Sequence, residues 1–362
     1  MTRRAGWLAL LLLFLGATAL LMRGQGAQNI EDTVAQFAAR EEISGGVIAF
    51  GKTGEAPLLH AFGKTPVTGE AIRTGDRFRI ASLSKPLTAA AVVEAAQRAD
   101  ISLNSPMARI LPEFASTADR RMARITLADL LRHSGGWDRE IDADPLFLSA
   151  AERATMFGTT PDSAPADCSA IARAGLSRPL QFDPGARHAY SNIGYCWLGL
   201  WLEKVTGKSY PDAVHALVPE AAGFTLDPAL LDVVPAVPEE AAAWPVMNAA
   251  AIAPAGGWIA DAATYFAFAG RKIAAEQAIR PTYGEPEEYY GMGWRFWRID
   301  GVRYRTHYGA MPGVFSVVIV REDGQAVVAL FAGSPSDYDS AFADLFARIR
   351  MAAEWQPASA KR

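Results

Sequence analysis

Segments with the pattern of β-strands stand near the two ends of this chain, and a long stretch with helical spacing separates them. The strand-like runs are 46–50, 57–62, 304–308, 314–321 and 326–332. Between about 82 and 270 the apolar residues instead recur at helical intervals. Because strands need partners, the simplest assembly is one antiparallel sheet built from both ends of the chain, with the helical region inserted between its second and third strands.

Helical patterns also flank the predicted strands, over 29–42 before the first strand and 341–355 after the last. Inside the inserted region, helices are predicted over 86–98, 127–133 behind an N-cap at Thr126, 193–205, and up to 269 behind an N-cap at Asp261. The predicted fold class is α/β, of the α+β kind: an antiparallel five-stranded sheet flanked by terminal helices, with an inserted all-helical region.

The first residues differ in character from the rest. Arg3 and Arg4 precede an uncharged, mostly apolar run over 5–22, which is typical of an export segment. A small-x-small site at 17–19 favours a cleaved signal peptide, and the run is also just long enough to cross a bilayer as an anchor. We therefore expect a signal peptide or membrane anchor over 1–27, one domain over 28–356 whose helical insert spans about 82–270, and a disordered tail over 357–362. The protein is expected outside the cytosol, periplasmic or extracellular, with residues 5–22 as its tether if they are retained.

Cys168 and Cys196 are the two cysteines of the chain. In an oxidising compartment they can form a single disulfide, and they can equally be two small buried side chains. The sequence leaves both alternatives open.

Composition excludes some functions. The formal net charge is -4, and the charged residues make up 20% of the chain, so it has no basic stripe of the kind that nucleic-acid binding requires. The five histidines are far apart, and none lies in a His-Glu-x-x-His motif, so no metal site is expected. We expect no cofactor, and the sequence does not indicate an oligomeric state.

Ser82 and Lys85 form the first motif with chemical meaning. Residues three apart share one face of a helix, so a helix that starts near Ser82 would place the Lys85 amine beside its hydroxyl. The positive end of that helix would also favour an oxyanion. The alternative is a serine N-cap followed by a surface lysine.

Two later motifs can complete such a site. Tyr190 and Asn192 form the only Tyr-x-Asn of the chain, and a nearby Lys85 would lower the pKa of the phenol, which makes either residue a candidate base. His307 and Gly309 lie on a predicted strand, where a glycine permits close approach of a ligand or of another backbone. No serine lies in a Gly-x-Ser-x-Gly motif, which disfavours an α/β-hydrolase.

Together these motifs resemble those of the serine β-lactamase and penicillin-binding-protein superfamily, in its class C-like branch of β-lactamase-related serine hydrolases. The resemblance covers roughly residues 31–355 and implies a β-lactamase-like fold. Besides the three motifs, the sequence segments that support this resemblance are, in chain order, 130–136, 184–185, 205–209, 256–258 and 312–313.

Residue by residue, the resemblance implies that Ser82 is an acylated nucleophile, with Lys85 and Tyr190 as its proton-transfer partners. Asn192 would hold Lys85 and the substrate amide. The backbone N–H groups of Ser82 and Ala310 would form the oxyanion hole, and Gly309 would line the substrate site. No cofactor is implied.

His307 departs from the family pattern, because β-lactamases and DD-peptidases of this family usually carry a lysine there that helps to bind a substrate carboxylate. A neutral histidine is more usual in the esterases and D-amino-acid peptidases of the branch. The resulting hypothesis is an exported serine hydrolase that cleaves esters, or amides of small or D-configured substrates, through an acyl-enzyme. The alternatives are a β-lactamase or D-Ala-D-Ala carboxypeptidase, and a non-catalytic module that binds cell-wall peptide.

Overall fold

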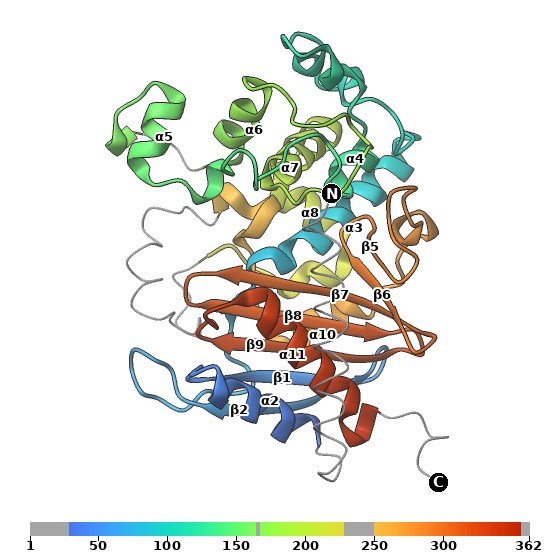
Figure 1. The fold of residues 1–362 in the computed structure, drawn as a ribbon. Coiled ribbons are helices and arrows are strands. Elements are labelled where there is room, and N and C mark those ends of the chain that lie inside the picture. Colours follow the sequence, from blue (N-terminus) through green and yellow to red (C-terminus); the bar gives the residue numbers. More distant parts are fainter. Residues whose placement is uncertain (1–28, 164–166, 228–249, 356–362) are drawn as a thin grey trace.

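The computed structural model describes residues 29–163, 167–227 and 250–355 (Figure 1). The expected export segment over 1–27 and the expected tail over 357–362 lie outside the described residues. In the part of the chain that is described, no helix is both long enough and apolar enough to cross a membrane.

The centre of the fold is a single antiparallel sheet, as predicted, but it has seven strands rather than five. The strand order is β2-β1-β9-β8-β7-β6-β5. The two strands that the sequence did not predict, β5 and β6, are short strands at one end of the sheet, with β5 at its edge. Charged residues interrupt their apolar residues, so their pattern is weak. The strands are β1 (Gly45–Lys52), β2 (Leu58–Gly63), β5 (Glu288–Tyr290), β6 (Arg295–Ile299), β7 (Val302–Met311), β8 (Val314–Arg321) and β9 (Gln325–Ala332).

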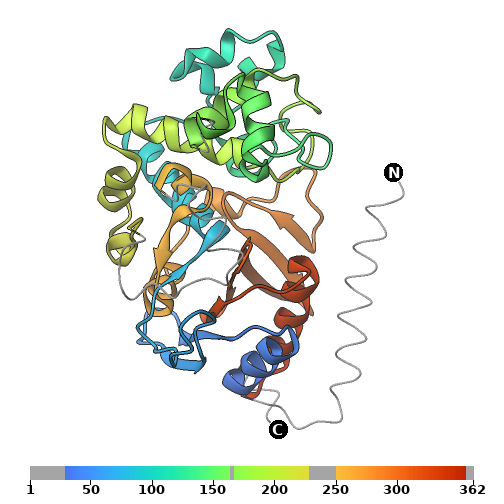
Figure 2. The same cartoon turned by 90° about the vertical axis from the view of Figure 1, so that its left-hand side faces the viewer.

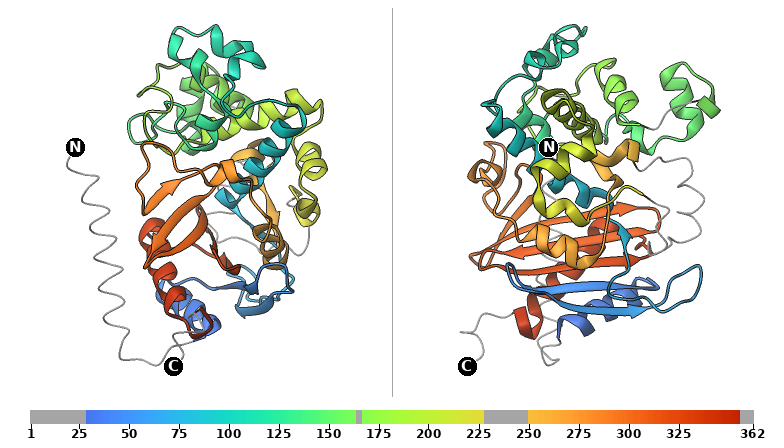
Figure 3. Two further views of the ribbon diagram at one scale, coloured as in Figure 1. Left: turned by 90° about the vertical axis from the view of Figure 1, so that its right-hand side faces the viewer. Right: turned by 180° about the vertical axis from the view of Figure 1, so that it is seen from behind.

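Both faces of the sheet are covered by helices (Figures 2 and 3). Helices α2 (Ile30–Arg40) and α11 (Tyr338–Met351) lie side by side on one face, where they pack on residues such as Val317. On the other face, α3 (Ser84–Arg98) and α10 (Ala262–Ala269) share a core with Val318. Because alternate strand residues point to opposite faces, central strands such as β8 are apolar throughout.

The inserted region contains the predicted helices and some structure that was not predicted. Thr126 caps its helix through a reciprocal capping box with Asp129, as expected, but α4 ends at Leu131 rather than at His133. The region is also not all-helical, because β3 (Phe78–Arg79) pairs with β4 (Ile259–Ala260) beside the main sheet. The other α-helices in the described residues of this region are α5 (Ala150–Phe157), α6 (Cys168–Leu176), α7 (Asn192–Thr206) and α8 (Tyr210–Leu217).

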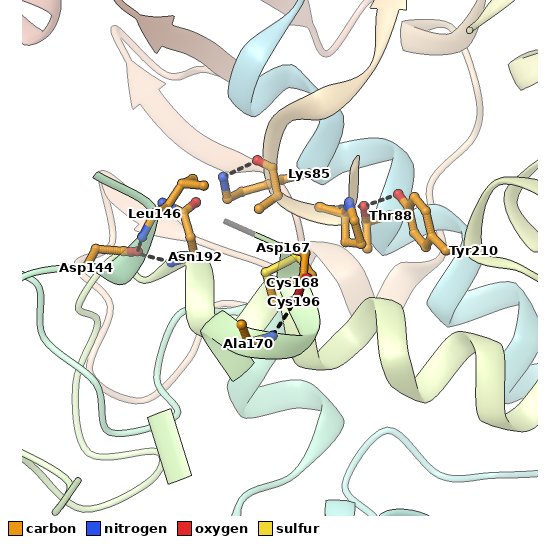
Figure 4. Close-up of a disulfide and its surroundings, with 12 residues drawn as sticks. Lys85, Thr88, Asp144, Leu146, Asp167, Cys168, Ala170, Asn192, Cys196 and Tyr210 are labelled. Carbon is orange, nitrogen blue, oxygen red and sulfur yellow. Dashed lines mark hydrogen bonds between the residues drawn. A yellow bond between two sulfur atoms is a disulfide. The ribbon is translucent and has the colours of Figure 1, made fainter. Parts of the chain in front are cut away.

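Cys168 and Cys196 form a disulfide, which decides between the two alternatives that the sequence left open. Cys168 is the first residue of α6 and Cys196 lies in the first turns of α7. The bond therefore joins two helices of the insert near the end of α7 that carries Asn192 (Figure 4).

Candidate active site

Ser82 lies on a tight turn that connects β3 to α3. It is the middle residue of a short 3-10 helix (Ala81–Leu83), and Ala81 has a φ of 45°, a left-handed conformation that costs a non-glycine residue about 1 kcal/mol or more. The carbonyl oxygen of Ile80 accepts a hydrogen bond of 2.9 Å from Ser316 Oγ on β8. The sheet therefore fixes the turn, and half-buried Ser82 lines a cleft.

Lys85 lies one helical turn after Ser82, as the spacing predicts. Its Nζ is 3.0 Å from Ser82 Oγ and donates a 2.6 Å hydrogen bond to the carbonyl oxygen of Ala255. The side chain is completely buried. Burial lowers the pKa of Lys85 well below its ordinary value, although the negative charge of Asp144 opposes this effect. A neutral amine beside a hydroxyl can accept its proton.

Tyr190 is the second side chain that contacts the Ser82 hydroxyl. Its hydroxyl donates a hydrogen bond of 2.9 Å to Ser82 Oγ, and its ring stacks on His133 at 4.1 Å between centroids. The expectation that Lys85 would lower the pKa of this phenol is wrong, because burial raises the pKa of Tyr190 above its ordinary value. The phenol is therefore protonated, and Lys85 is the better base of the pair.

Asn192 is the first residue of α7 and is buried close to Lys85 (Figure 4). Its backbone N–H donates a 2.8 Å hydrogen bond to the Asp144 carboxylate. Its side-chain oxygen Oδ1 has no hydrogen-bond partner. The expected hydrogen bond from Asn192 to Lys85 is not made in this structure, and Oδ1 is a buried acceptor without a donor, which is costly unless a ligand supplies one.

His307 is buried on β7 with both ring nitrogens occupied. Nδ1 donates to the Tyr308 carbonyl oxygen at 2.8 Å, so Nε2 accepts the Tyr290 hydroxyl at 2.9 Å. Burial and then the charge of Lys85 lower the pKa of His307 to about 3. His307 is therefore neutral and has no N–H group left for a substrate.

Gly309 and Ala310 form the part of β7 that lies next to Ser82. The pairing of β7 with β6 ends at Thr306, so the following residues have an open edge, and Ala310 lines the cleft with Ser82. A β-carbon on Gly309 would collide with the backbone before Ser82. The glycine thus permits the close approach that its place on a strand predicts.

The residues from these elements surround one cleft with a volume of about 590 Å³. Among the residues that the structure describes, no three His, Cys, Asp or Glu side chains lie together as a metal site would require. The lining residues are Ser82, Arg139, Phe147, Tyr190, Tyr290, Arg295, Thr306, His307, Tyr308, Ala310, Met311, Pro312, Ser336, Asp337, Tyr338, Asp339 and Phe342.

Several residues near the nucleophile were not predicted from the sequence. Asp144 lies in the insert and binds both Asn192 and the backbone of Leu146, while Arg139 and Arg295 line the cleft. None of these residues belongs to a motif. A signal was present only for Asp144, whose place directly before a proline is typical of a capping residue.

The fold and this arrangement of serine, lysine and tyrosine define the class of β-lactamase-like and penicillin-binding-protein-like serine hydrolases. The chain belongs to the Beta-lactamase family, whose model matches residues 30–350. The predicted resemblance and the predicted fold class are thereby confirmed.

Individual proteins are similar to parts or most of this chain. The "Probable fimbrial assembly protein FimD, serogroup H1" of Dichelobacter nodosus is 36% identical over 139 residues, which are 38% of this chain and 32% of that protein. Esterase EstB of Burkholderia gladioli is 32% identical over 201 residues, 53% of this chain and 49% of EstB. The match thus spans half or less of the length of each of these two relatives. The crystal structure of D-amino acid amidase from Ochrobactrum anthropi SV3 has a similar fold, with a TM-score of 0.68 at 18% identity over 88% of this chain and 98% of that one.

Proposed function

We propose that this protein is an exported serine hydrolase that cleaves esters, or amides of small or D-configured substrates, through a covalent acyl-enzyme at Ser82. The observation that carries the proposal is the convergence of Lys85 Nζ, at 3.0 Å, and Tyr190 Oη, at 2.9 Å, on one hydroxyl oxygen. A serine needs such partners because its hydroxyl is a weak nucleophile at its own pKa.

In the acylation step, Ser82 Oγ attacks the substrate carbonyl carbon while neutral Lys85 takes the Oγ proton. The backbone N–H groups of Ser82 and Ala310 stabilise the oxyanion that forms. The bond to the leaving group then breaks, and the Tyr190 hydroxyl gives its proton to the departing oxygen or nitrogen. The Lys85 ammonium returns a proton to Tyr190.

In the deacylation step, water attacks the ester formed with Ser82. The same amine takes a proton from the water, and the ester oxygen leaves as the Ser82 hydroxyl. The product acid departs, and Ser82, Lys85 and Tyr190 regain their starting protonation states.

The cleft supports a small substrate, since its volume is about 590 Å³. Among the similar proteins named for a reaction are an esterase and a D-amino acid amidase, whose names match the ester and amide substrates proposed. Neutral His307, with both nitrogens engaged, gives no support to carboxylate recognition of the kind that β-lactams would need at this position.

Export rests on two features. Residues 1–27 have the composition of a signal peptide or anchor, and the disulfide between Cys168 and Cys196 is a bond that persists in oxidising compartments. A fusion of the first 40 residues to a reporter active only outside the cytosol tests this part. An inactive reporter fusion would contradict export and leave the chemistry at Ser82 unaffected.

Intact mass spectrometry tests the chemistry. We expect a fluorophosphonate probe and a para-nitrophenyl ester to add their acyl or phosphonyl mass to the wild-type protein, and Ser82→Ala to abolish both adducts. Ser102→Ala, which changes an exposed serine that does not line the cleft, is the matched control and should react fully.

Other outcomes assign other functions. Rapid acylation by a penicillin or a D-Ala-D-Ala peptide, faster than by esters, would make the protein a β-lactamase or carboxypeptidase. Peptide binding that survives Ser82→Ala, without any turnover, would make it a binding module. A wild-type protein inert to all these reagents would reject the proposed hydrolase.

A further inference from the structure

A second pocket lies on β5, β6 and β7, the strands at one end of the sheet (Figure 1). Its volume is about 740 Å³, which is typical of a small-molecule site. Among the described residues, none lines both this pocket and the cleft at Ser82. Its lining includes apolar side chains such as Ile273, Phe296 and Val320. The proposed reaction makes no use of this second pocket.

The second pocket is strongly basic, although the protein as a whole is acidic. Five arginines and two glutamates line it, whereas the formal net charge of the chain is -4. Burial raises the pKa of the Tyr289 hydroxyl, and three positive charges oppose this rise. They belong to Arg303, Arg280 and Arg298. The three charges therefore act on one small volume and give the pocket a positive potential.

Two of these arginines lie directly opposite each other in the sheet. Arg298 on β6 pairs with Arg303 on β7, and Arg305 is the diagonal neighbour of Arg298. Like charges in such positions destabilise a sheet. A local arrangement that costs stability is expected at a functional site, and an anion between these side chains would make it favourable.

The protein itself neutralises only part of this charge. Arg298 is exposed, and within the described residues its side chain has no hydrogen-bond or ion-pair partner. Half-buried Arg305 donates to the carbonyl oxygen of Ala269, but its buried Nε has no partner. Burial lowers the pKa of Arg305 to about 10, because few groups replace its lost hydration. Arg303, in contrast, pairs with Glu322 at 3.0 Å.

This set of donors suits a dianion better than a carboxylate. One arginine fork satisfies both oxygens and the single charge of a carboxylate. A phosphate monoester carries about two negative charges and three acceptor oxygens, which suit several guanidinium groups around one point. The rings of Tyr289 and Phe296, stacked at 5.1 Å between centroids, also line the pocket and suit an apolar group attached to the phosphate.

We propose that the second pocket binds a phosphate monoester whose organic part is apolar, and that Arg298, Arg303 and Arg305 hold its phosphate group. This site does not depend on the proposed hydrolase function, because its lining residues lie outside the cleft. A soluble phosphate ester and the headgroup of phosphatidic acid share this chemistry, and the experiment distinguishes the two sources.

Calorimetry with the whole protein tests the site, with phenyl phosphate as the probe. We expect phenyl phosphate to bind about 10-fold more tightly than benzoate, and Arg298→Gln to weaken its binding about 10-fold, as for the loss of a charged hydrogen bond. Arg298 is exposed, so this variant should fold normally. Arg295→Gln is the matched control, because it removes an arginine of the same strand that lines the cleft instead, and it should leave the binding unchanged.

Glu322→Gln adds a result that a folding defect would not imitate. The change removes the carboxylate that pairs with Arg303 and frees this guanidinium group for the ligand. We expect phenyl phosphate to bind about 2- to 5-fold more tightly to the variant than to the wild type. Unchanged or weaker binding would contradict the position of the phosphate beside Arg303.

Vesicles of phosphatidylcholine, with and without phosphatidic acid, identify the source of the phosphate. Binding of phenyl phosphate in solution assigns a soluble ester. Sedimentation with the phosphatidic acid vesicles that Arg298→Gln abolishes, without binding of phenyl phosphate, assigns the lipid headgroup. Absence of binding to both probes would overturn the inference. Binding that is lost in Arg295→Gln but survives Arg298→Gln would place the anion in the cleft and would also overturn it.

Discussion

The α-carbon of Gly309 lies against the peptide that carries Ser82. A β-carbon at position 309 would stand 2.1 Å from the carbonyl oxygen of Ile80 and 3.0 Å from the backbone nitrogen of Ser82. The added carbon would also lie 2.4 Å from Ser316 Oγ. The contact with the Ile80 oxygen is too short for any side chain, and it is made to the backbone, which cannot turn away. The distance between strand β7 and the nucleophile is therefore set by the absence of a side chain at this position.

We expect Gly309→Ala to reduce kcat/KM for esters about 100-fold, because the strand must move away and misplace the proposed oxyanion donors by a substantial part of an ångström. Gly75→Ala is the control, since nothing lies within 4 Å of the added carbon there. Steady-state kinetics measures the effect. Full activity of Gly309→Ala would show that the approach of β7 is not needed.

Asp144 connects the insert to the start of α7, because it accepts the backbone N–H groups of Asn192 and Leu146 at 2.8 and 3.0 Å. We expect Asp144→Ala to leave both donors unsatisfied and to lower the free energy of unfolding by about 2 kcal/mol. It should also lower kcat more than it raises KM, since Asn192 lies beside Lys85 (Figure 4).

Asp144→Asn retains one acceptor oxygen and should recover part of both losses. Asp162→Ala, at an exposed position of the insert, should cause neither loss. Chemical denaturation and steady-state kinetics measure the two effects. An Asp144→Ala protein with unchanged stability would contradict the role of this carboxylate as a cap.

The buried amine of Lys85 predicts a pH dependence of activity. The base must be neutral, so kcat/KM is high above the pKa of Lys85 and is lost as the pH falls through it. Because burial lowers this pKa, the plateau should begin well below about 10.4, the ordinary value for lysine.

Lys85→Arg should reduce kcat/KM about 1,000-fold at every pH, because a guanidinium does not give up its proton. Lys204→Arg, at an exposed position on α7, is the control. An activity profile that rises only near the ordinary lysine pKa would contradict the assignment of the base.

His307 predicts a pH dependence of stability. Its pKa is about 3 in the folded protein against 6.5 for an ordinary histidine, so between these limits the unfolded chain binds a proton that the folded chain does not. Stability therefore falls as the pH falls through this window, by at most about 1.4 kcal/mol per pH unit from this residue. Buried His133, whose pKa is also lowered, contributes in the same direction.

The His307→Gln protein should lose less Tm than the wild type between pH 6.5 and pH 4. The His60→Gln protein, changed on the edge strand β2, should show the same decrease of Tm with pH as the wild type. Thermal unfolding followed by circular dichroism gives both slopes. Parallel slopes in the wild type and His307→Gln would mean that His307 titrates normally.

The parts of this site that were predictable depend on short-range spacing. Lys85 lies beside Ser82 because residues three positions apart share one face of a helix. Thr126 is recognisable as an N-cap because the residues that follow it have a helical pattern. The central strands were also predicted, because apolar runs with turn residues between them form the same structure in many contexts.

The parts that were not predictable depend on contacts between distant residues. Asp144 and Asn192 are 48 positions apart, and nothing near either residue indicates the other. Arg295 lies on β6, a short strand that the pattern did not reveal. The pKa of Tyr190 was predicted in the wrong direction because burial, which the sequence does not state, outweighs the nearby cation.

The central pairing of the sheet has a consequence for how the molecule forms. Strand β1 pairs with β9, so that Gly46 lies opposite Phe331 and Lys52 lies opposite Gln325. Strand β1 can pair with β2 early, but almost the whole chain must be synthesised before β1 can pair with β9, and such distant pairing is slow. For the export proposed for this chain, the delay would keep the sheet incomplete during passage through a membrane channel, until β9 reaches the far side.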